Sequence, residues 1–237
     1  MGWRSWNCFK LEVTQPLIEA QVAALASDGP GSADSLLAVG YDRIGIDDGW
    51  QACGAGVGGS FHDAAGKALV NKTRFPDMLK MNRFALAFGV KMGWYQNNCF
   101  CHQQENAAFS ASDGEGGHPV LDAKMTAALE FDGAKIDGCG PATKIAVWAK
   151  ALNATGRKIL LEDCGTNGPN DFGTKTWEPP TIAQLQDCPA HLYRVSKDIA
   201  PQFYSTMYNL QHTTLYQDEK RPMSRPGCGI RHCLPTT

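Results

Sequence analysis

Short apolar runs that end in polar residues alternate along the chain with longer stretches of helical periodicity. The run at 41–48 is typical, because it places Ile44 and Ile46 on one face and ends in two carboxylates. Period-two runs of this length are typical of β-strands. We predict strands at 1–6, 41–48, 91–97, 134–138, 158–163 and 191–198.

The stretches between these runs have the spacing of amphipathic helices. Thr14 can cap a helix with Pro16 in its first turn, and Ile18, Val22 and Leu25 follow at helical intervals. A further helical stretch covers 201–213. Two more apolar stripes are predicted to face the core: Leu121, Met125 and Leu129, then Ile145, Trp148 and Leu152.

Alternating strands and helices predict a parallel sheet that helices cover. A doubly wound nucleotide-binding sheet has little support, since no G-x-G-x-x-G follows the early strands. Polar residues at nearly every strand end favour an α/β fold of the (β/α)8 TIM barrel type, whose active site is built at that end. We count six of the eight βα units, and the residues after 214 are too few for two more.

Composition narrows the functional classes. The 237 residues carry 22 Lys+Arg and 24 Asp+Glu, so the net charge of −2 argues against a nucleic-acid or membrane-surface partner. Hydrophobic residues make up 43% and charged residues 19%, which is typical of a globular domain. No apolar run reaches the ~20 residues of a membrane span, and no leader precedes the first strand.

Nine cysteines and two glycosylation sequons, at Asn71 and Asn153, favour an oxidising secretory compartment. The odd count leaves at least one thiol without a partner in the chain. The cysteine spacings at 99–102 and 228–233 are poor for zinc. We therefore predict neither a metal site nor a cofactor.

Candidate chemistry gathers at the predicted strand ends. Parallel strands would bring these groups to one barrel mouth together with the aromatic residues Trp3, Trp6, Trp50 and Tyr95. Carboxylates beside aromatic rings suggest sugar chemistry, although each acid alone could be a helix cap. The strand-end groups are Asp47, Asp48, Lys135, Asp137, Glu162, Asp163, Arg194 and Asp198.

Ordered segments of the chain resemble motifs of glycoside hydrolase family 27, the clan of α-galactosidases and α-N-acetylgalactosaminidases. The opening MGWRSWN resembles the family's MGWNSWN, and YDRIGIDDGW at 41–50 resembles its motif ending in DDGW. FPDMLK at 75–80 and GVKMGWY at 89–95 resemble FPxGMK and GLKxGIY. KIDGC at 135–139 resembles the nucleophile motif KxDxC, and YRVSKDI at 193–199 resembles the acid/base motif WRxxxDI.

The resemblance implies retaining hydrolysis of terminal α-D-galactosyl residues, with Asp137 as nucleophile and Asp198 as acid/base. Lys135 would favour the ionised form of Asp137. The resemblance also implies galactose-binding roles for Asp47, Asp48, Lys135 and Arg194, and sugar-pocket positions for Trp6 and Tyr95.

Glu162 lies where the family places the residue that reads the 2-position substituent of the sugar. A glutamate there favours galactose over N-acetylgalactosamine, although the local order Glu-Asp-Cys differs from the family's Cys-Glu-Trp. The alternatives are an α-N-acetylgalactosaminidase or an inactive fragment with residual carbohydrate binding.

The resemblance also implies a disulfide from Cys99 or Cys101 to Cys139. On the same picture Cys164 could pair with Cys188, and Cys8 with Cys53.

The resemblance covers residues 1–228, and 229–237 match nothing in the family, as after a frameshift or a mispredicted exon. We therefore expect an incomplete barrel whose first and sixth strands are open edges, which a homodimer could cover. The expected location is secreted, vacuolar or lysosomal, with the leader absent from this chain.

Overall fold

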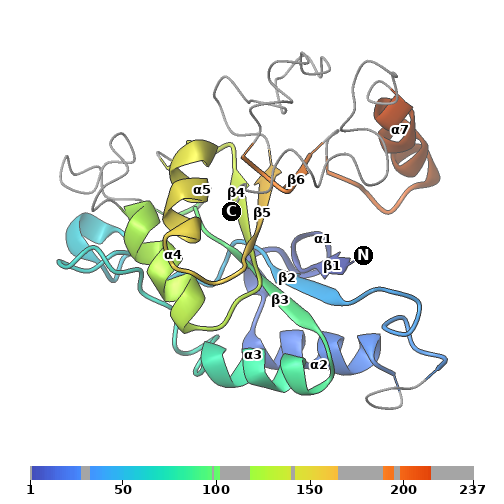
Figure 1. Ribbon diagram of the computed structural model, residues 1–237, viewed down its shortest axis with the longest axis horizontal. Coiled ribbons are helices and arrows are strands. Elements are labelled where there is room, and N and C mark those ends of the chain that lie inside the picture. Colours follow the sequence, from blue (N-terminus) through green and yellow to red (C-terminus); the bar gives the residue numbers. More distant parts are fainter. Residues whose placement is uncertain are drawn as a thin grey trace.

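The computed structural model describes residues 2–27, 33–97, 99–101, 118–139, 142–164, 189–194 and 198–214. Their centre is a sheet of six parallel strands in the order β1-β2-β3-β4-β5-β6 (Figure 1). The strands are β1 Gly2–Arg4, β2 Arg43–Ile46, β3 Lys91–Tyr95, β4 Gly133–Asp137, β5 Leu160–Cys164 and β6 Leu192–Tyr193. Sequential parallel order confirms the six predicted strands and the partial (β/α)8 barrel, and within these described ranges β1 and β6 end the sheet.

Strand register sets which residues stand side by side on the sheet. Gly45, Gly93 and Gly133 are aligned across β2, β3 and β4. Two residues nearer the carboxyl ends of the strands, and so on the same face of the sheet, Tyr95 aligns with Lys135, and Lys135 aligns with Glu162. The candidate site is therefore one transverse row of the sheet, next to a row that is largely glycine.

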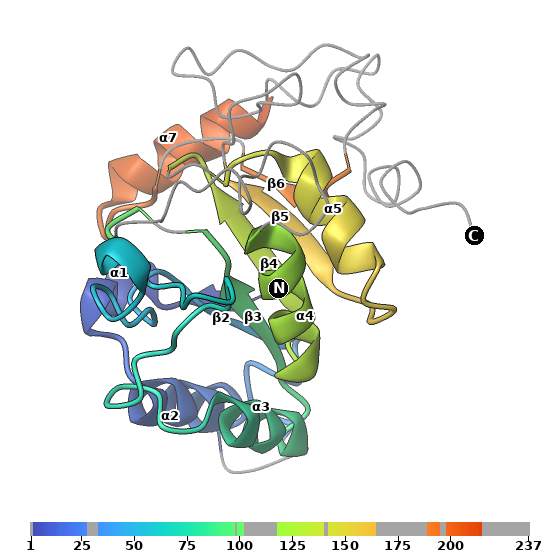
Figure 2. The ribbon, with the colours of Figure 1, turned by 90° about the vertical axis from the view of Figure 1, so that its left-hand side faces the viewer.

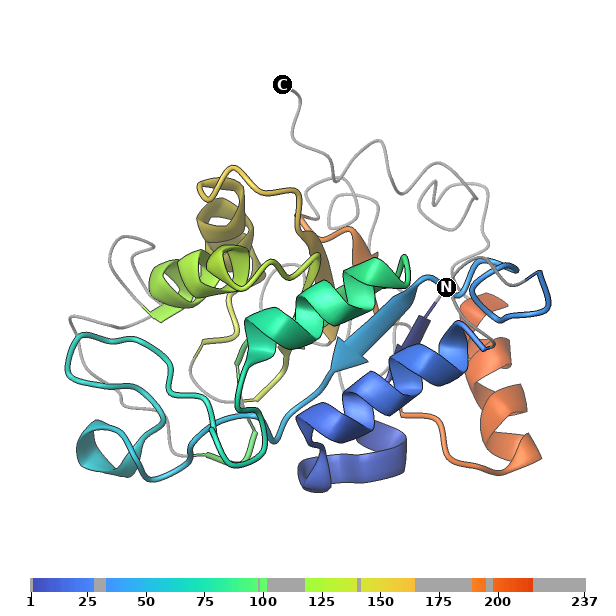
Figure 3. The same ribbon diagram turned by 90° about the horizontal axis from the view of Figure 1, so that it is seen from below.

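Helices follow the strands and pack along the sheet (Figures 2 and 3). Figure 3 shows α2, α3, α4 and α5 on one side of the sheet, while α7 lies apart from them. No helix among the described residues has both the length and the apolar character that a membrane crossing requires. The α-helices are α1 Trp6–Phe9, α2 Gln15–Leu25, α3 Met78–Ala87, α4 His118–Ala128, α5 Ile145–Asn153 and α7 Phe203–Thr214, with 3₁₀ turns at Lys10–Glu12 and Val57–Gly59.

Helix α2 forms as the sequence predicts. The Thr14 side chain accepts a hydrogen bond from the backbone N–H of Leu17 at 3.4 Å, and a proline lies in the first turn. Ile18, Val22 and Leu25 are all buried. The predicted stripe of Ile145, Trp148 and Leu152 on α5 is buried as well.

The most buried face of helix α4 is not the predicted one, although Met125 and Leu129 still pack against the apolar cluster around β2 and β3. Leu121, Met125 and Leu129 are only half-buried, whereas the fully buried stripe is polar and begins at His118. Asp122 contacts His62 Nε2 at 3.2 Å, and Thr126 donates to Gln96 Oε1 at 3.0 Å. Buried polar groups need hydrogen-bond partners, so these contacts decide the orientation of the helix more than its leucines do.

Two apolar clusters hold the sheet. The larger lies around β2 and β3 and contains Trp50, whose ring centroid is 4.5 Å from that of Trp94. The smaller lies around β4, β5 and α5. The placement of Trp50 at the barrel mouth is therefore wrong: its side chain is 2% exposed, and its indole N–H donates to the Tyr95 carbonyl at 2.8 Å. Trp3 packs edge-on against Phe9 and is also among the lining residues of the cavity described below.

The disulfide predictions are partly confirmed. Cys99 is bonded to Cys139, which selects one of the two alternatives. The pairing of Cys8 with Cys53 is wrong, because Cys53 is bonded to Cys101 while Cys8 is free and exposed on α1. Strand order alone does not choose between the two pairings, because β2 pairs with β1 as well as with β3. Cys164 is a free, buried thiol; its predicted partner Cys188 lies outside the described residues, as do Met1 and the tail 229–237.

Candidate active site

The centre of the candidate site is the Lys135 ammonium. It donates to Asp47 Oδ2 at 2.7 Å and lies 3.6 Å from Asp137 Oδ2. Lys135 and Asp47 are buried, whereas the Asp137 side chain is 23% exposed. Lysine therefore links a buried carboxylate at the end of β2 to an accessible one at the end of β4.

Backbone contacts fix Asp137. Its N–H donates to Asn97 Oδ1 at 2.8 Å, and its Oδ1 accepts from the N–H of Gly138 at 2.8 Å. The amide of Asn97 donates to the carbonyls of Asp137 and Cys139, at 2.6 and 2.8 Å. Asn97, which follows β3, thus clamps the end of β4 and directs the carboxylate of Asp137.

The Cys99–Cys139 disulfide borders this group. Asp48 Oδ2 accepts the N–H of Cys99 at 2.9 Å, and the Tyr95 hydroxyl lies 2.9 Å from Cys99 Sγ. The Lys135 ammonium is 5.1 Å from the centroid of the Tyr95 ring. The loop after β3 is therefore bound to the acids of β2 and to the loop after β4.

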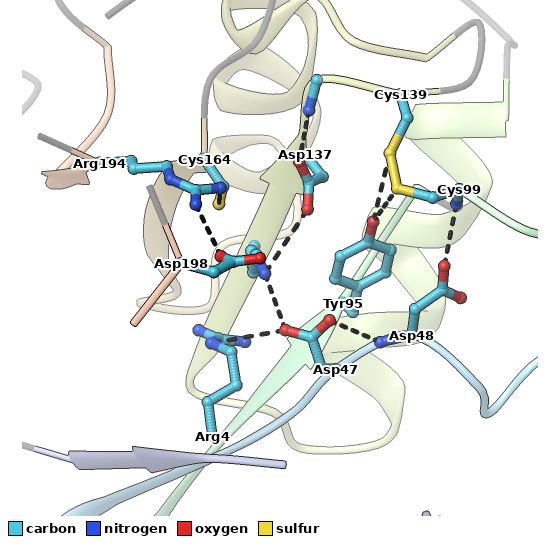
Figure 4. Close-up of polar contacts among 12 residues, drawn as sticks. Arg4, Asp47, Asp48, Tyr95, Cys99, Asp137, Cys139, Cys164, Arg194 and Asp198 are labelled. Carbon is cyan, nitrogen blue, oxygen red and sulfur yellow. Dashed lines mark hydrogen bonds and ion pairs between the residues drawn. A yellow bond between two sulfur atoms is a disulfide. The ribbon is translucent and has the colours of Figure 1, made fainter. Parts of the chain in front are cut away.

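Asp198 is held from the other side. Arg194 donates to Asp198 Oδ1 at 2.6 Å and to the Cys164 sulfur at 3.4 Å. The Asp198 side chain is 60% exposed. Figure 4 shows the carboxylates of Asp47, Asp137 and Asp198 directed toward a common space.

Glu162, on β5, faces the same space and forms an ion pair with Arg4 of β1. Arg4 Nε also lies 3.8 Å from Asp47 Oδ2. A cavity of about 920 Å³ opens beside these groups, and Arg4, Lys135, Glu162, Arg194 and Asp198 are among its lining residues. The structure thus brings together the predicted strand-end groups of this site except Asp163, which is fully buried and aligns with Ile136 on the opposite face of β5 from Glu162. Trp6 packs against Phe100, the neighbour of Cys99, and lies under Lys10.

Burial and charge set the ionisation of the central groups. Burial opposes the charged form of Lys135, but anionic neighbours including Asp47 and Asp137 raise its pKa above the usual value. Burial raises the pKa of Asp48 above its usual value, and this effect outweighs the hydrogen bond from the backbone N–H of Cys99, which lowers it. Burial and the nearby Asp137 raise the pKa of Tyr95, which stays a neutral phenol at physiological pH.

One group of described residues has the residue types of a metal site. Cys99, Asp137 and Cys139 place three ligand-type atoms within 4.8 Å of one another. The two sulfurs form a disulfide, however, and metals bind thiolates. This group therefore does not offer a thiolate metal site.

Two contributors were missed in the sequence. Arg4 stands where the family's opening motif has asparagine, and this departure was the available signal. Asn97 follows the third strand without a motif of its own, and its contact with Asp137 depends on the pairing of β3 with β4.

Acids and cations at the carboxyl ends of a curled parallel sheet are typical of a (β/α)-barrel glycoside hydrolase. The chain belongs to the family described as Alpha galactosidase A, whose model matches residues 1–230. It is 29% identical over 209 residues to α-galactosidase A of Cellvibrio japonicus, covering 85% of this chain and 44% of that protein. It is 30% identical over 201 residues to α-galactosidase 2 of Arabidopsis thaliana, covering 79% and 45%. The chain thus spans less than half the length of these relatives.

Solved structures agree on the fold. A Bacteroides fragilis protein assigned as an α-galactosidase superposes with a TM-score of 0.60 at 27% identity, over 84% of this chain and 38% of that chain. A family 27 β-L-arabinopyranosidase from Geobacillus stearothermophilus gives a TM-score of 0.64 at 16% identity, over 92% and 57%. The second likeness concerns the fold alone.

Proposed function

We propose that the site hydrolyses terminal α-D-galactosyl residues with retention of configuration. The observation that carries this proposal is the placement of Asp137 and Asp198. Asp137 presents an accessible carboxylate beside the Lys135 ammonium, and Asp198, held by Arg194, lines the adjoining cavity. Family membership and the α-galactosidase relatives support the substrate class.

In the proposed mechanism Asp137 attacks the anomeric carbon and Asp198 protonates the leaving oxygen. The bond to the leaving group breaks as the glycosyl–aspartate bond forms. Asp198, now ionised, takes a proton from water, which attacks the same carbon and releases Asp137. Lys135 places a positive charge 3.6 Å from the attacking carboxylate, and the Asn97 clamp fixes the direction of attack.

The remaining polar groups would bind the sugar. Asp47 and Lys135 form a buried acceptor–donor pair suited to adjacent hydroxyls, and Tyr95 supplies an aromatic ring next to them. Asp48 and Arg194 would supply further hydrogen bonds to the sugar from opposite ends of this group of residues. Glu162 would accept from the 2-hydroxyl, which favours galactose over its N-acetylamino analogue.

The two disulfides support an oxidising location, which we propose to be secreted, vacuolar or lysosomal. Asn153 is exposed at the end of α5 and stays a predicted glycosylation site. Asn71 is half-buried, and its side-chain oxygen accepts from the N–H groups of Thr73 and Arg74, both at 3.2 Å. A homodimer stays a prediction.

The test is hydrolysis of 4-nitrophenyl α-D-galactopyranoside by the purified chain, with the α-N-acetylgalactosaminide assayed in parallel. We expect turnover of the galactoside that is lost in Asp137→Ala, and an initial product with the α configuration by proton NMR. Turnover of the N-acetyl substrate alone would favour the second substrate class. A β product would exclude double displacement, and folded protein that turns over neither substrate would contradict the proposal.

A further inference from the structure

Arg4 makes a contact that crosses the concave side of the sheet. It lies on the first strand, and its partner Glu162 lies on the fifth. Four steps of about 4.8 Å separate such strands in a flat sheet, about 19 Å in all and beyond the combined reach of the two side chains. The ion pair therefore exists only because the sheet curls, and it joins the two sides of the curl.

The guanidinium also lies against the second strand. Arg4 aligns with Gly45 in the register, and a Cβ at Gly45 would lie 2.8 Å from Arg4 Nη1 and 2.9 Å from Cζ. A Cβ does not approach a non-bonded heavy atom this closely, so glycine at position 45 is what lets the guanidinium lie there. From this position Arg4 reaches both Asp47, at 3.8 Å, and Glu162.

This geometry constrains Glu162. Arg4 Nη2 donates to Oε2, while a carboxylate has a second oxygen that can accept another hydrogen bond. The Glu162 side chain is 26% exposed and lines the cavity, so a ligand can reach it. Without Arg4, the Glu162 side chain would be free to change rotamer before a sugar binds. Fixing it on binding would cost conformational entropy and so weaken the binding of the sugar.

We propose that Arg4 is a positioning residue that determines specificity at the 2-position: it bridges Asp47 and Glu162 over Gly45 and holds Glu162 ready to accept from an equatorial 2-hydroxyl. This inference rests on the proposed function and adds a residue to it. A planar guanidinium can serve two carboxylates at once, which the compact ammonium of lysine does poorly.

Two variants displace the guanidinium in different ways. Arg4→Lys keeps the positive charge but loses the planar guanidinium that can donate to two carboxylates at once. Gly45→Ala keeps Arg4 but occupies its resting place, and the atoms it meets are the far end of a flexible side chain, so the backbone need not move. Gly93→Ala is the matched control, because its added methyl would lie 3.6 Å from the Cα of Gly45, an ordinary contact.

The readout is the ratio of affinities for methyl α-D-galactopyranoside and its 2-deoxy analogue, measured by isothermal titration calorimetry. A hydrogen bond to a charged group corresponds to roughly tenfold or more in affinity, so we expect a ratio of about ten or above in the unsubstituted chain. The ratio should fall to about threefold or less in Arg4→Lys and Gly45→Ala, and stay unchanged in Gly93→Ala. A structural role alone would weaken both sugars equally and leave the ratio intact.

The outcomes separate the inference from the proposed function. If the unsubstituted chain binds the galactoside better than the 2-deoxy sugar and Gly45→Ala retains that ratio, the role of Arg4 is overturned while the proposed function stands. If the folded, unsubstituted chain binds neither sugar, both fall. Urea unfolding of Arg4→Leu, Glu162→Gln and the double variant then shows whether the contact exists: additive losses would mean that Arg4 does not hold Glu162 at all.

Discussion

The two sides of the candidate site are built differently. On β2–β4, Asp47 and Lys135 are buried, the larger apolar cluster lies behind them, and two disulfides join the loops after these strands. On the other side β6 has two residues, Asp198 is 60% exposed, and α7 leaves Phe203 80% exposed. The comparison shows that the proposed nucleophile is positioned by the sheet and its cross-links, while the proposed acid/base is held, among the residues that the structure describes, by Arg194.

The largest expected effect separates the two acids by chemistry. Asp137→Asn should lower turnover on the order of 10⁴-fold or more for any leaving group, because no covalent intermediate forms. Asp198→Asn should cost roughly 10²–10⁴-fold for methyl α-D-galactopyranoside, since a methoxide must be protonated as it leaves. It should cost far less in glycosylation of a 2,4-dinitrophenyl galactoside, whose leaving group needs no proton.

Steady-state turnover of the methyl galactoside and the pre-steady-state burst of 2,4-dinitrophenolate measure this difference. Asp63→Asn, at a half-buried acid in the loop after β2, is the control and should retain the full burst. Equal losses for both leaving groups in Asp198→Asn would contradict its role as the acid.

The next effect is on stability. Replacing both Cys99 and Cys139 by serine opens a loop with a sequence separation of 40 residues, and the chain-entropy model predicts a loss of about 4 kcal/mol. Urea unfolding would show this as a lower midpoint. Cys8→Ser, which removes the exposed free thiol, should leave the midpoint unchanged. An equally small effect of both changes would mean that the sheet holds this side without its cross-link.

A smaller effect is expected from the two ion pairs, because that of Lys135 with Asp47 should contribute more to the free energy of unfolding than that of Arg194 with Asp198. Lys135→Met leaves Asp47 buried with only the more distant Arg4, which should cost about 3 kcal/mol of unfolding free energy. Arg194→Met exposes an already accessible Asp198 and should cost less than about 1 kcal/mol. Lys91→Met, at the exposed pair with Asp42, is a control for the loss of a surface charge. Equal costs at 135 and 194 would contradict the contrast between the two sides.

The smallest effect is a difference in thiol reactivity. Burial raises the pKa of Cys164 to about 11, so about one Cys164 thiol in a thousand is ionised at pH 8. Its alkylation by iodoacetamide should rise about tenfold per pH unit until that pKa is reached, because only the thiolate reacts. Peptide mass spectrometry should find Cys8, which is exposed, modified first at pH 8. Faster modification of Cys164 would mean that this side of the site opens readily.

Many of the helices and strands, and the positions of the strand-end acids, could be predicted from local sequence. The capping of α2 by Thr14 and the strand-end positions of Asp47, Lys135 and Asp137 depend on neighbours within a few residues. The apolar period placed Met125 and Leu129 against the core but missed the most buried face of α4. The pattern carries no information on which distant residue supplies the hydrogen-bond partner for a buried polar side chain. His62, 60 residues from Asp122, supplies that partner.

The sequence by itself determined the elements, their parallel order and which acids stand at the strand ends, because hydrogen-bond periodicity and side-chain alternation are local. Only the tertiary structure decided which loops become cross-linked and which residues meet across the curl. Cys53 bonds Cys101 and not Cys8, although β2 pairs with both β1 and β3, and Arg4 meets Glu162 because the sheet bends β1 toward β5. These contacts join residues 48 and 158 positions apart, and no local pattern encodes a distance that the curvature of the whole sheet sets.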